Sequence, residues 1–479
     1  MFISFIVDGG ANAVTSVPVR VAGYPLGATG VATGEELATH PILGRLACPS
    51  LTRLNLLRKE SEGFLLSRIE VEPSGTSARW KLELKPGLHW WSGEPVTGQD
   101  LARFLEEKLR PQIVEMSLGL WPVPEFVVSS TAPKSVTVSW AKTPSFGPFV
   151  LSRIPFTRTS KEHLECAGDY RMVEDAAATK LVPVAKGTTL REVWLNHTDK
   201  DETPADIDFQ FSEVFTGASL AAIAQDKAQC ARPIDLPVVT VISWDPNGRF
   251  TAEPDFRRAL TQAVPRGALL RAGTGLLGDL VSGPLLRAHP GYDKSLLVRP
   301  FDLRQAAETL ERLKYRRPLA DSTRLTPEGK PLELALYSPQ GVGLLQKVIV
   351  DSFNMLGIRV TFVADPKASF DGALSGMALP WPDADFLTFV HSKAPRNAPF
   401  WGVSDKELDA RLEAYALSLT RTKPDFQELQ TIHRILYNLE PFTILVQHRT
   451  CLVTHTKFRA DFPKVIIRNP DWFFELING

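Results

Sequence analysis

Apolar residues recur at every second position in several short stretches, as they do in half-buried strands. Valines alternate with other residues over 14–24, and the pattern breaks at Tyr24-Pro25. A hairpin-like stretch over 63–88 contains a second alternating run, which ends in a turn predicted at Pro86-Gly87. The face of this run that we expect to be buried carries Trp80, Leu82 and Leu84. Further strands are predicted within 180–208, at 237–244 and at 443–448.

Apolar stripes with the period of a helix alternate with these strands. Thr97 is predicted to cap the first helix, because Asp100 stands three residues later, where a carboxylate faces the free amides of a helix start. Its buried stripe comprises Leu101, Phe104, Leu105 and Leu109. Other helices are predicted to begin at Asp255, at the cap Asp302 and at the cap Ser404, and a last one spans about Asp425 to Leu439.

The clearest local unit lies at 332–363. A strand at 332–337 is followed by a helix that ends at Gly357 and by a second strand at 358–363. Glycine suits the left-handed position just past a helix end, and the spacing fits a right-handed crossover between parallel strands. The chain therefore contains at least one β-α-β unit and is predicted to have an α/β fold.

Length and charge narrow the class of protein. With 479 residues the chain exceeds what one hydrophobic core usually serves, so two or three lobes are expected. Lys plus Arg and Asp plus Glu both total 54, which leaves no excess of positive charge for nucleic acid or an anionic membrane. No segment approaches the roughly 20 apolar residues of a membrane-spanning helix.

The cysteines and the N-terminus each allow two interpretations. Cys48, Cys166, Cys230 and Cys451 lie far apart without a C-x-x-C pair, so they are either buried small apolar residues or two disulfides in one of three connectivities. Met1 to Val7 is a short apolar run without preceding basic residues. It is either the remnant of a signal peptide or a tail without meaning.

The stretch 79–101, RWKLELKPGLHWWSGEPVTGQDL, carries a specific motif. It resembles the signature K-x-G-x-x-W/F-x-D-G-x-P-V-T-A-x-D of the bacterial peptide- and nickel-binding family of extracellular solute-binding proteins, with Ser92 in place of Asp and Gly98 in place of Ala. Further matches follow in family order to about residue 450. They include DFRRAL at 255–260, FDLRQAAETL at 301–310 and EPFTIL at 440–445.

This resemblance implies a periplasmic-binding-protein-like clamp with two lobes, three domains and a hinge between the lobes. Domain I would be discontinuous, formed by 14–45, 168–240 and 452–479, with domain II at 46–167 and domain III at 241–451. Such proteins capture a solute between the first and third domains by hinge closure and deliver it to the membrane permease of an ABC transporter. We expect a monomer without cofactor, metal or catalytic residues, in the periplasm or on the extracellular face of the cytoplasmic membrane.

The ligand-binding residues expected from the resemblance lie mainly near 377–387. Peptide-binding members carry there an Asp that pairs with the free amine of the ligand, but Leu379 occupies this position here. Asp383 or Asp385 would replace it if the alignment shifted by a few residues, although either also suits a turn or a helix cap. The other candidate ligand contacts are Tyr24, Trp244, Asn247, Trp381 and Trp401. Each tryptophan taken alone is more often a core residue, and the sequence P-N-G is also typical of a turn.

Three rival functions stay open. The clamp could hold a non-peptide solute such as an oligosaccharide or a metal chelate, which the missing Asp and the tryptophans both allow. It could be a cytosolic sensor of the same fold, which the weak signal peptide favours. An enzyme is not expected, because the sequence contains no H-E-x-x-H, no G-x-S-x-G and no phosphate-binding glycine-rich loop.

Overall fold

The structure is a computed structural model that describes most of the chain. The described residues are 19–22, 46–55, 60–74, 76–117, 119–160, 163–175, 178–184, 192–196, 209–212, 229–271, 278–285, 287, 289–319, 322–338, 343–378, 390–394, 403–419 and 424–455. The N-terminal run Met1 to Val7 lies outside them. Within the described residues, no helix is both long enough and apolar enough to span a membrane.

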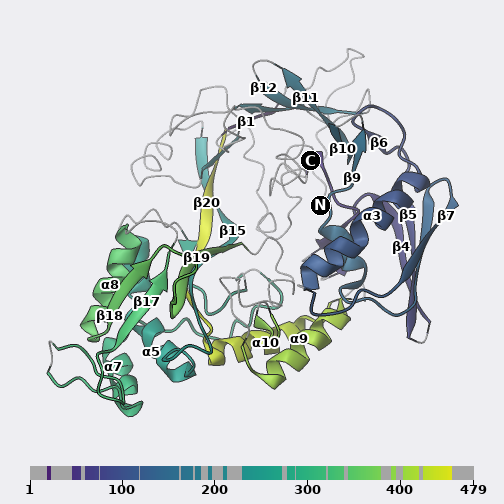
Figure 1. The fold of residues 1–479 in the computed structure, drawn as a ribbon. Coiled ribbons are helices and arrows are strands. Elements are labelled where there is room, and N and C mark those ends of the chain that lie inside the picture. The colour runs from purple at the N-terminus through teal and green to yellow at the C-terminus, as the bar shows by residue number, and fades with distance from the viewer. Residues whose placement is uncertain are drawn as a thin grey trace.

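A mixed sheet of eleven strands runs through the molecule (Figure 1). Its order is β11-β12-β13-β1-β14-β20-β15-β19-β17-β18, and β16 pairs with β20. The strands are β1 (Val19–Ala22), β11 (Tyr170–Asp175), β12 (Ala178–Pro183), β13 (Val193–Asn196), β14 (Phe209–Ser212), β15 (Gln229–Trp244), β16 (Gly278–Asp279), β17 (Glu333–Tyr337), β18 (Arg359–Val363), β19 (Gly372–Ala378) and β20 (Phe442–His455).

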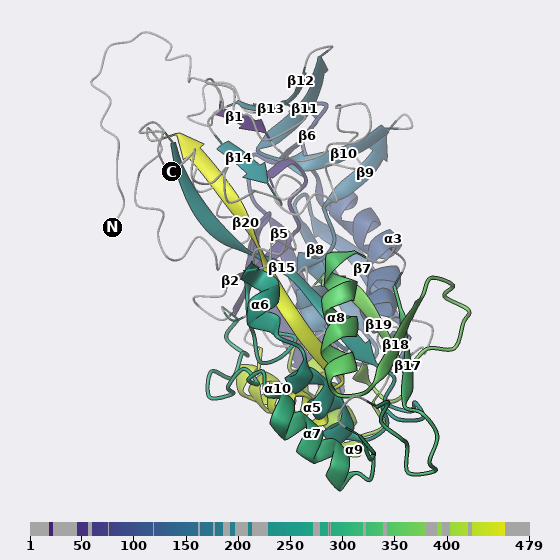
Figure 2. The same cartoon turned by 90° about the vertical axis from the view of Figure 1, so that its left-hand side faces the viewer.

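Strands β15 and β20 pair antiparallel and connect two parts of this sheet. The upper end of β20 pairs with β14, and the lower half of β15 pairs with β19, so the pair crosses from one part of the molecule to the other (Figure 2). Both strands are longer than the predicted runs 237–244 and 443–448. We call this pair the crossing strands.

Residues 46–160 form a separate region that contains its own sheet, β4-β5-β8-β7. Strand β5 alternates as predicted, since Trp80, Leu82 and Leu84 are all buried. The elements of this region and its junction with the large sheet are β2 (Thr52–Asn55), β3 (Glu60–Gly63), β4 (Leu66–Ser74), β5 (Ser77–Leu84), β6 (His89–Trp90), α3 (Gly98–Ser117), β7 (Phe126–Ala132), β8 (Ser135–Trp140), the 3-10 helix η1 (Gly147–Ser152), β9 (Thr157–Ser160) and β10 (His163–Gly168).

Helix α3 forms as its sequence predicts. The backbone N–H of Thr97 donates to the Asp100 carboxylate at 2.9 Å, and the Asp100 N–H donates to the Thr97 hydroxyl at 3.2 Å. Two amides at the helix start are thereby satisfied. The whole predicted stripe, Leu101, Phe104, Leu105 and Leu109, is buried.

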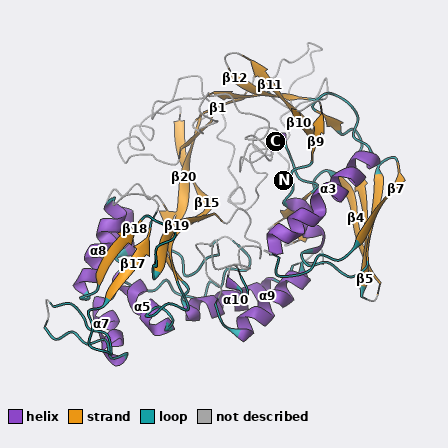
Figure 3. Cartoon of the chain, viewed as in Figure 1, coloured by secondary structure: helices purple, strands orange, loops and turns teal. Residues whose placement is uncertain are grey.

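The remaining helices lie in the lower part of the molecule, whereas strands dominate its upper part (Figure 3). They are α5 (Pro254–Ala263), α6 (Arg266–Arg271), α7 (Leu303–Arg312), α8 (Leu344–Met355), α9 (Lys406–Ser418) and α10 (Phe426–Leu439). The β-α-β unit is confirmed, because β17 and β18 are parallel with α8 between them and Gly357 has a φ of 78°. The cap Asp302 is also confirmed, since its carboxylate accepts from the Gln305 N–H at 2.8 Å.

Two predicted helix starts need correction. Helix α9 is capped by Asp405 and not by Ser404, because the Asp405 carboxylate accepts the Leu408 N–H at 2.8 Å. A carboxylate at this position also interacts favourably with the helix dipole. Helix α5 begins at Pro254, one residue before the predicted Asp255, since proline has the backbone geometry of a first helical position and Glu253 acts as the cap.

The disulfide interpretation is confirmed for one pair of cysteines. Cys48 and Cys166 form a disulfide across a sequence separation of 118 residues. It lies beside the predicted boundaries 45/46 and 167/168, where the chain enters and leaves the region 46–160. The side chains of Cys230 and Cys451 lie outside the described part of the structure. The disulfide therefore links the two passages of the chain into this region.

Strand β15 contributes to two hydrophobic cores through its two faces. Val239 and Val241 belong to a core that contains the interior of the region 46–160 and also α10. Ile242 and Trp244 belong to a second core, which is formed with α5, α7 and α8. Because side chains of a strand alternate between its faces, the lower half of β15 separates these two cores.

Candidate functional site

Two of the seven predicted ligand-binding residues lie in the described part of the structure. These are Trp244 and Asn247, at the lower end of β15. Tyr24, Trp381, Asp383, Asp385 and Trp401 lie outside the described residues, as does Leu379. For these five the predicted role stays a prediction.

Trp244 is a core residue in this structure. Only 1% of its surface is exposed, and its indole N–H donates to the Thr443 hydroxyl at 2.9 Å. The ring lies 6.3 Å from that of Phe353, and a Cβ added to Gly372 would stand 2.8 Å from it. The alternative noted for each tryptophan, a place in the core, describes this one, because its donor is satisfied and its ring is covered.

Asn247 lies in an exposed turn just after β15. Its backbone N–H donates to the Asp245 carboxylate at 2.9 Å, and the Gly248 N–H donates to the Asp245 carbonyl at 3.1 Å. This is the turn chemistry that the sequence P-N-G also indicated. Whether the Asn247 side chain contacts a ligand stays a prediction.

The ladder between β15 and β19 ends close to Asn247 on one side and at Ala378 on the other. Gly372 of β19 pairs with Trp244, close to Asn247, whereas the last residue of β19, Ala378, pairs with Val238. Six residue steps along a strand correspond to about 20 Å. The end of β19 at Ala378 therefore lies far from Asn247, beside the middle of the crossing strands.

The middle of the crossing strands is irregular and polar. The pairing of β15 with β20 shifts register between Asp235 and Val239 and again between Thr240 and Val241. The Thr240 hydroxyl lies 2.6 Å from His448 Nε2. Such irregularities bend a strand locally, and they often occur beside functional sites.

A buried glutamine fixes a neighbouring segment to the same place. Gln447 is 1% exposed, and its side-chain oxygen accepts the backbone N–H of Arg287 at 3.2 Å. Strand β16 pairs with Gln447 and His448, and a Cβ on Gly278 would lie 2.0 Å from the Gln447 carbonyl oxygen. Sequence reasoning missed these residues, although polar Gln447 and His448 do interrupt an apolar run. The candidate site is therefore the junction of β15, β16, β19 and β20.

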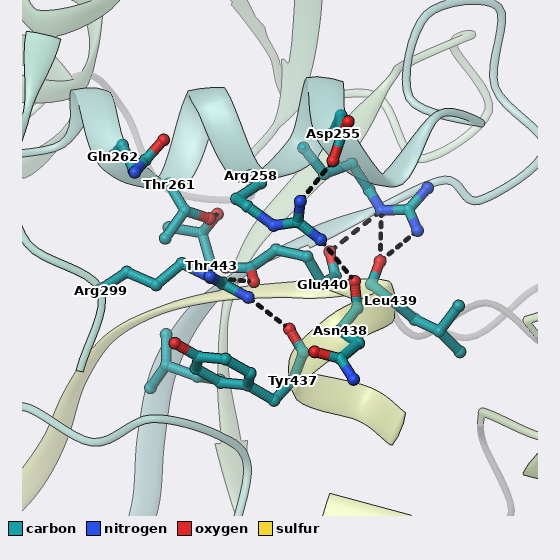
Figure 4. Close-up of polar contacts among 12 residues, drawn as sticks. Asp255, Arg258, Thr261, Gln262, Arg299, Tyr437, Asn438, Leu439, Glu440 and Thr443 are labelled. Atoms are coloured by element: carbon teal, nitrogen blue, oxygen red, sulfur yellow. Dashed lines mark hydrogen bonds and ion pairs between the residues drawn. The ribbon is translucent and has the colours of Figure 1, made fainter. Parts of the chain in front are cut away.

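Below this junction, arginines satisfy the carbonyl end of α10 (Figure 4). The last carbonyls of a helix have no partner within it. The Leu436 carbonyl accepts the Glu440 N–H at 2.9 Å. The others accept from arginine side chains: Tyr437 from Arg299 at 2.7 Å, Asn438 from Arg258 at 3.1 Å, and Leu439 and Glu440 from Arg257 at 3.1 and 3.0 Å. We call Arg257, Arg258, Arg299 and Glu440 the arginine clasp.

Arg257 and Glu440 of the clasp are buried, whereas Arg258 and Arg299 are partly exposed. Glu440 lies past the helix end with a φ of 49°, and its carboxylate contacts Arg299 at 2.6 Å. Burial raises the pKa of Glu440, and the guanidinium of Arg299 opposes this shift. Burial lowers the pKa of Arg257 to about 10, so it remains charged at neutral pH. Two motifs of the resemblance, DFRRAL and EPFTIL, thus meet in a structural contact that anchors the start of β20.

Two buried histidines lie close together, since His433 belongs to α10 and the ring of His289 lies 5.3 Å from that of Phe426 in the same helix. The Nδ1 of His289 accepts the Gly291 N–H at 2.9 Å, and the Nδ1 of His433 accepts the Asp293 N–H at 3.0 Å. Burial lowers the pKa of His289 to about 3 and that of His433 to about 4, so both rings are neutral at pH 7. Across the described residues, no three His, Cys, Asp or Glu side chains are placed to hold a metal ion.

Comparison by sequence finds no match, since neither a protein-family profile nor a curated protein matches the chain. Comparison by structure finds several. NikA from Brucella suis in complex with Fe(III)-EDTA has a TM-score of 0.71 at 14% identity, over 92% of this chain and 96% of that one. A putative peptide binding protein AppA from Clostridium difficile has a TM-score of 0.72 at 13% identity, over 95% and 99%.

A third similar structure is the periplasmic binding protein DppA from Helicobacter pylori in complex with the peptide STSA. Its TM-score is 0.64 at 14% identity, over 92% of this chain and 94% of that one. These proteins share a two-lobed α/β fold, and the predicted fold class is confirmed. The similarity covers nearly the full length of each chain, so it concerns the whole architecture and not one domain.

Proposed function

We infer that this chain, which has the fold of the peptide- and nickel-binding solute-binding proteins, is the substrate-binding component of an ABC importer. It captures a di- or oligopeptide between its lobes by hinge closure and delivers it to the membrane permease. The observation that carries this proposal is the match in fold over more than 90% of both chains. It acts as a monomer and has no catalytic residues or cofactor.

The arrangement of the described strands supports a hinge. The crossing strands are the part of the large sheet that joins its upper and lower strands, and their pairing is irregular at the middle. A ligand that contacts both lobes binds the closed form better than the open form, and only this difference shifts the population. The domains proposed for this clamp are domain I at 14–45, 168–240 and 452–479, domain II at 46–167 and domain III at 241–451.

A peptide is the proposed cargo, and a non-peptide solute such as an oligosaccharide or a metal chelate is the alternative. DppA is described in complex with a peptide, and NikA in complex with Fe(III)-EDTA. A peptide would place its amine near Asp383 or Asp385, with Tyr24, Trp381 and Trp401 as further contacts. The chelate is favoured by one specific feature, which is Leu379 at the position of the usual acidic anchor. An ammonium buried without a carboxylate costs several kcal/mol.

The disulfide supports a site of action outside the cytoplasm. Disulfides persist in oxidising compartments and are rare in the cytosol. The Cys48–Cys166 bond therefore favours the periplasm or the extracellular face of the membrane over the cytosolic sensor.

Native mass spectrometry tests the proposal directly. The protein is mixed with a random pool of two- to six-residue peptides, with Fe(III)-EDTA, or with a pool of oligosaccharides. Retained peptide masses, together with stabilisation of about 2 to 3 kcal/mol at a hundredfold excess over Kd, would support peptide capture. Retention of the chelate alone would assign the clamp to chelates, and no retention from any pool would contradict the proposed function.

If peptides bind, two exchanges locate the anchor for the amine. Asp383→Asn and Asp385→Asn each remove one carboxylate at nearly constant shape. We expect the exchange of the anchoring residue to weaken binding of free-amine peptides but not of N-acetylated ones. Equal loss for both kinds of peptide would contradict the anchor.

A further inference from the structure

Phe146 has an unusual backbone conformation for a bulky residue. Its φ is 67°, in the left-handed region, and its side chain is fully buried. A non-glycine residue there costs about 1–3 kcal/mol and persists only where its surroundings fix it. Contacts from elsewhere in the molecule must therefore hold Phe146 in this conformation.

The surroundings of Phe146 come partly from another region of the chain. Its backbone N–H donates to the carbonyl oxygen of Ala416 in α9 at 3.0 Å. Its ring meets the edge of Trp121, with ring centroids 5.7 Å apart, and Trp121 in turn meets His391 edge-on at 6.1 Å. Phe146 and Trp121 belong to the proposed domain II, whereas His391 and Ala416 belong to domain III.

The domain III side of this contact is firmly held. The Ser392 N–H and hydroxyl both donate to Asp409, at 2.9 and 2.5 Å, so the short segment 390–394 is fixed to α9. Ala416 is 1% exposed. The two domains share one hydrophobic core. Within it, Phe146 contributes the hydrogen bond to Ala416 and Trp121 contributes the contact with His391.

We propose that Phe146 is a positioning residue that latches domain II onto α9 in the closed clamp. The proposal rests on the function proposed above. Closure makes the Ala416 hydrogen bond and the contact of Trp121 with His391, and together these hold the left-handed backbone. Opening breaks both and releases the strain. The latch therefore sets the closed population before any solute arrives, and the apparent affinity scales with that population.

Hydrogen exchange of the wild-type protein tests the latch without any substitution. If the contact opens, the Phe146 amide exchanges at least tenfold faster than the amides of β8, which lie between β5 and β7 inside the domain II sheet. If the Phe146 amide exchanges as slowly as those of β8, the contact is permanent and the latch is wrong.

Small-angle scattering of solute-free variants provides a second test. Phe146→Gly removes the ring but tolerates the left-handed backbone, so the fold is not put at risk by strain. Because the N–H that binds the Ala416 carbonyl remains and the cost of the left-handed backbone is removed, we expect its open-to-closed ratio to fall. Trp121→Leu loses the contact with His391, so we expect its open-to-closed ratio to rise by about tenfold, with a larger radius of gyration. The control is Phe126→Leu, because Phe126 contacts Trp140 within the domain II sheet and should leave the radius unchanged.

An unchanged radius in Trp121→Leu would overturn the proposal. Both tests are done without solute, so they are independent of the cargo. If the radius rises but no peptide or chelate binds, the latch stands and the proposed function fails. If a solute binds to both proteins with equal affinity and the radius does not change, the latch alone fails.

Discussion

Two connections join the parts of this molecule, and they are built differently. The neck into the region 46–160 consists of two chain passages that are joined by the Cys48–Cys166 disulfide. Further hydrogen bonds reinforce it, from Phe156 N–H to the Pro49 carbonyl at 3.0 Å and from Trp91 N–H to the Cys166 carbonyl at 3.2 Å. The crossing strands also consist of two passages, but they are held by a ladder that shifts register twice.

The difference indicates which connection bends. A covalent link between neighbouring passages resists their relative motion, whereas a strand pair with register shifts can twist at the irregular step. We therefore expect domains I and II to move as one body. The hinge motion should lie in the crossing strands, above the arginine clasp.

The largest effect should come from removing the disulfide. Replacing both Cys48 and Cys166 with alanine frees a loop of more than a hundred residues in the unfolded chain, which costs about 4 kcal/mol in the chain-entropy account. Urea unfolding of the variant and of the reduced wild-type protein measures this loss. A loss below about 1 kcal/mol would show that the neck is held by its hydrogen bonds, and the comparison would fail.

The next effect should come from the clasp that anchors β20. Arg257→Met leaves the Leu439 and Glu440 carbonyls buried without their donor, so we expect the free energy of unfolding to fall by about 3 kcal/mol. Arg304→Met is the matched control, because Arg304 is exposed and pairs with Glu308 at the surface. Equal losses in both variants would show that the clasp contributes nothing specific.

Acid should weaken the protein through the buried histidines. Their folded pKa values, about 3 for His289 and about 4 for His433, lie below the value of about 6.5 expected for the unfolded chain. The unfolded state therefore binds more protons between these values, so stability is fully present above about pH 6.5 and falls as the pH drops. Between pH 7.5 and 5 we expect a loss of about 2 kcal/mol per histidine.

Chemical unfolding at several pH values measures this slope. In His433→Asn, the amide oxygen can replace Nδ1 as acceptor for the Asp293 N–H without titrating. The slope between pH 7.5 and 5 should therefore be about half that of the wild-type protein. An unchanged slope would show that other groups cause the acid sensitivity.

The smallest effect should come from one contact at the register shift. Thr240→Val removes the hydroxyl that lies 2.6 Å from His448, so we expect a loss of about 1 kcal/mol. The informative measurement is amide exchange along β15 and β20, which should increase near residue 240 and not at the neck. If exchange increases equally at the neck, the two connections do not move independently.

Local patterns in the sequence determined many of the elements. The alternation of β5, the stripe and cap of α3, the cap Asp302 and the β-α-β unit all depend on residues that are within a few positions of each other. The errors at Ser404 and Asp255 are of one residue, because adjacent polar residues compete for the same helix end. The family motif near Trp90 also led to the correct fold, although no sequence comparison finds it.

The candidate site depended on contacts that no local pattern contains. Sequence reasoning named Trp244 as a candidate ligand contact with a place in the core as the alternative. Its position beside Thr443 and Phe353 makes it part of a core. The register of β15 and β19 places Ala378 beside Val238, about 20 Å along the ladder from Trp244, and no local pattern predicts this distance.

The sequence by itself determined where strands and helices form, because periodicity and capping act over a few residues. Only the tertiary structure decided that Cys48 pairs with Cys166, that β15 serves two cores, and that Phe146 takes a left-handed backbone against Ala416. Each of these depends on partners that are distant in the chain. The free energy of such contacts exists only once the whole fold brings the partners together.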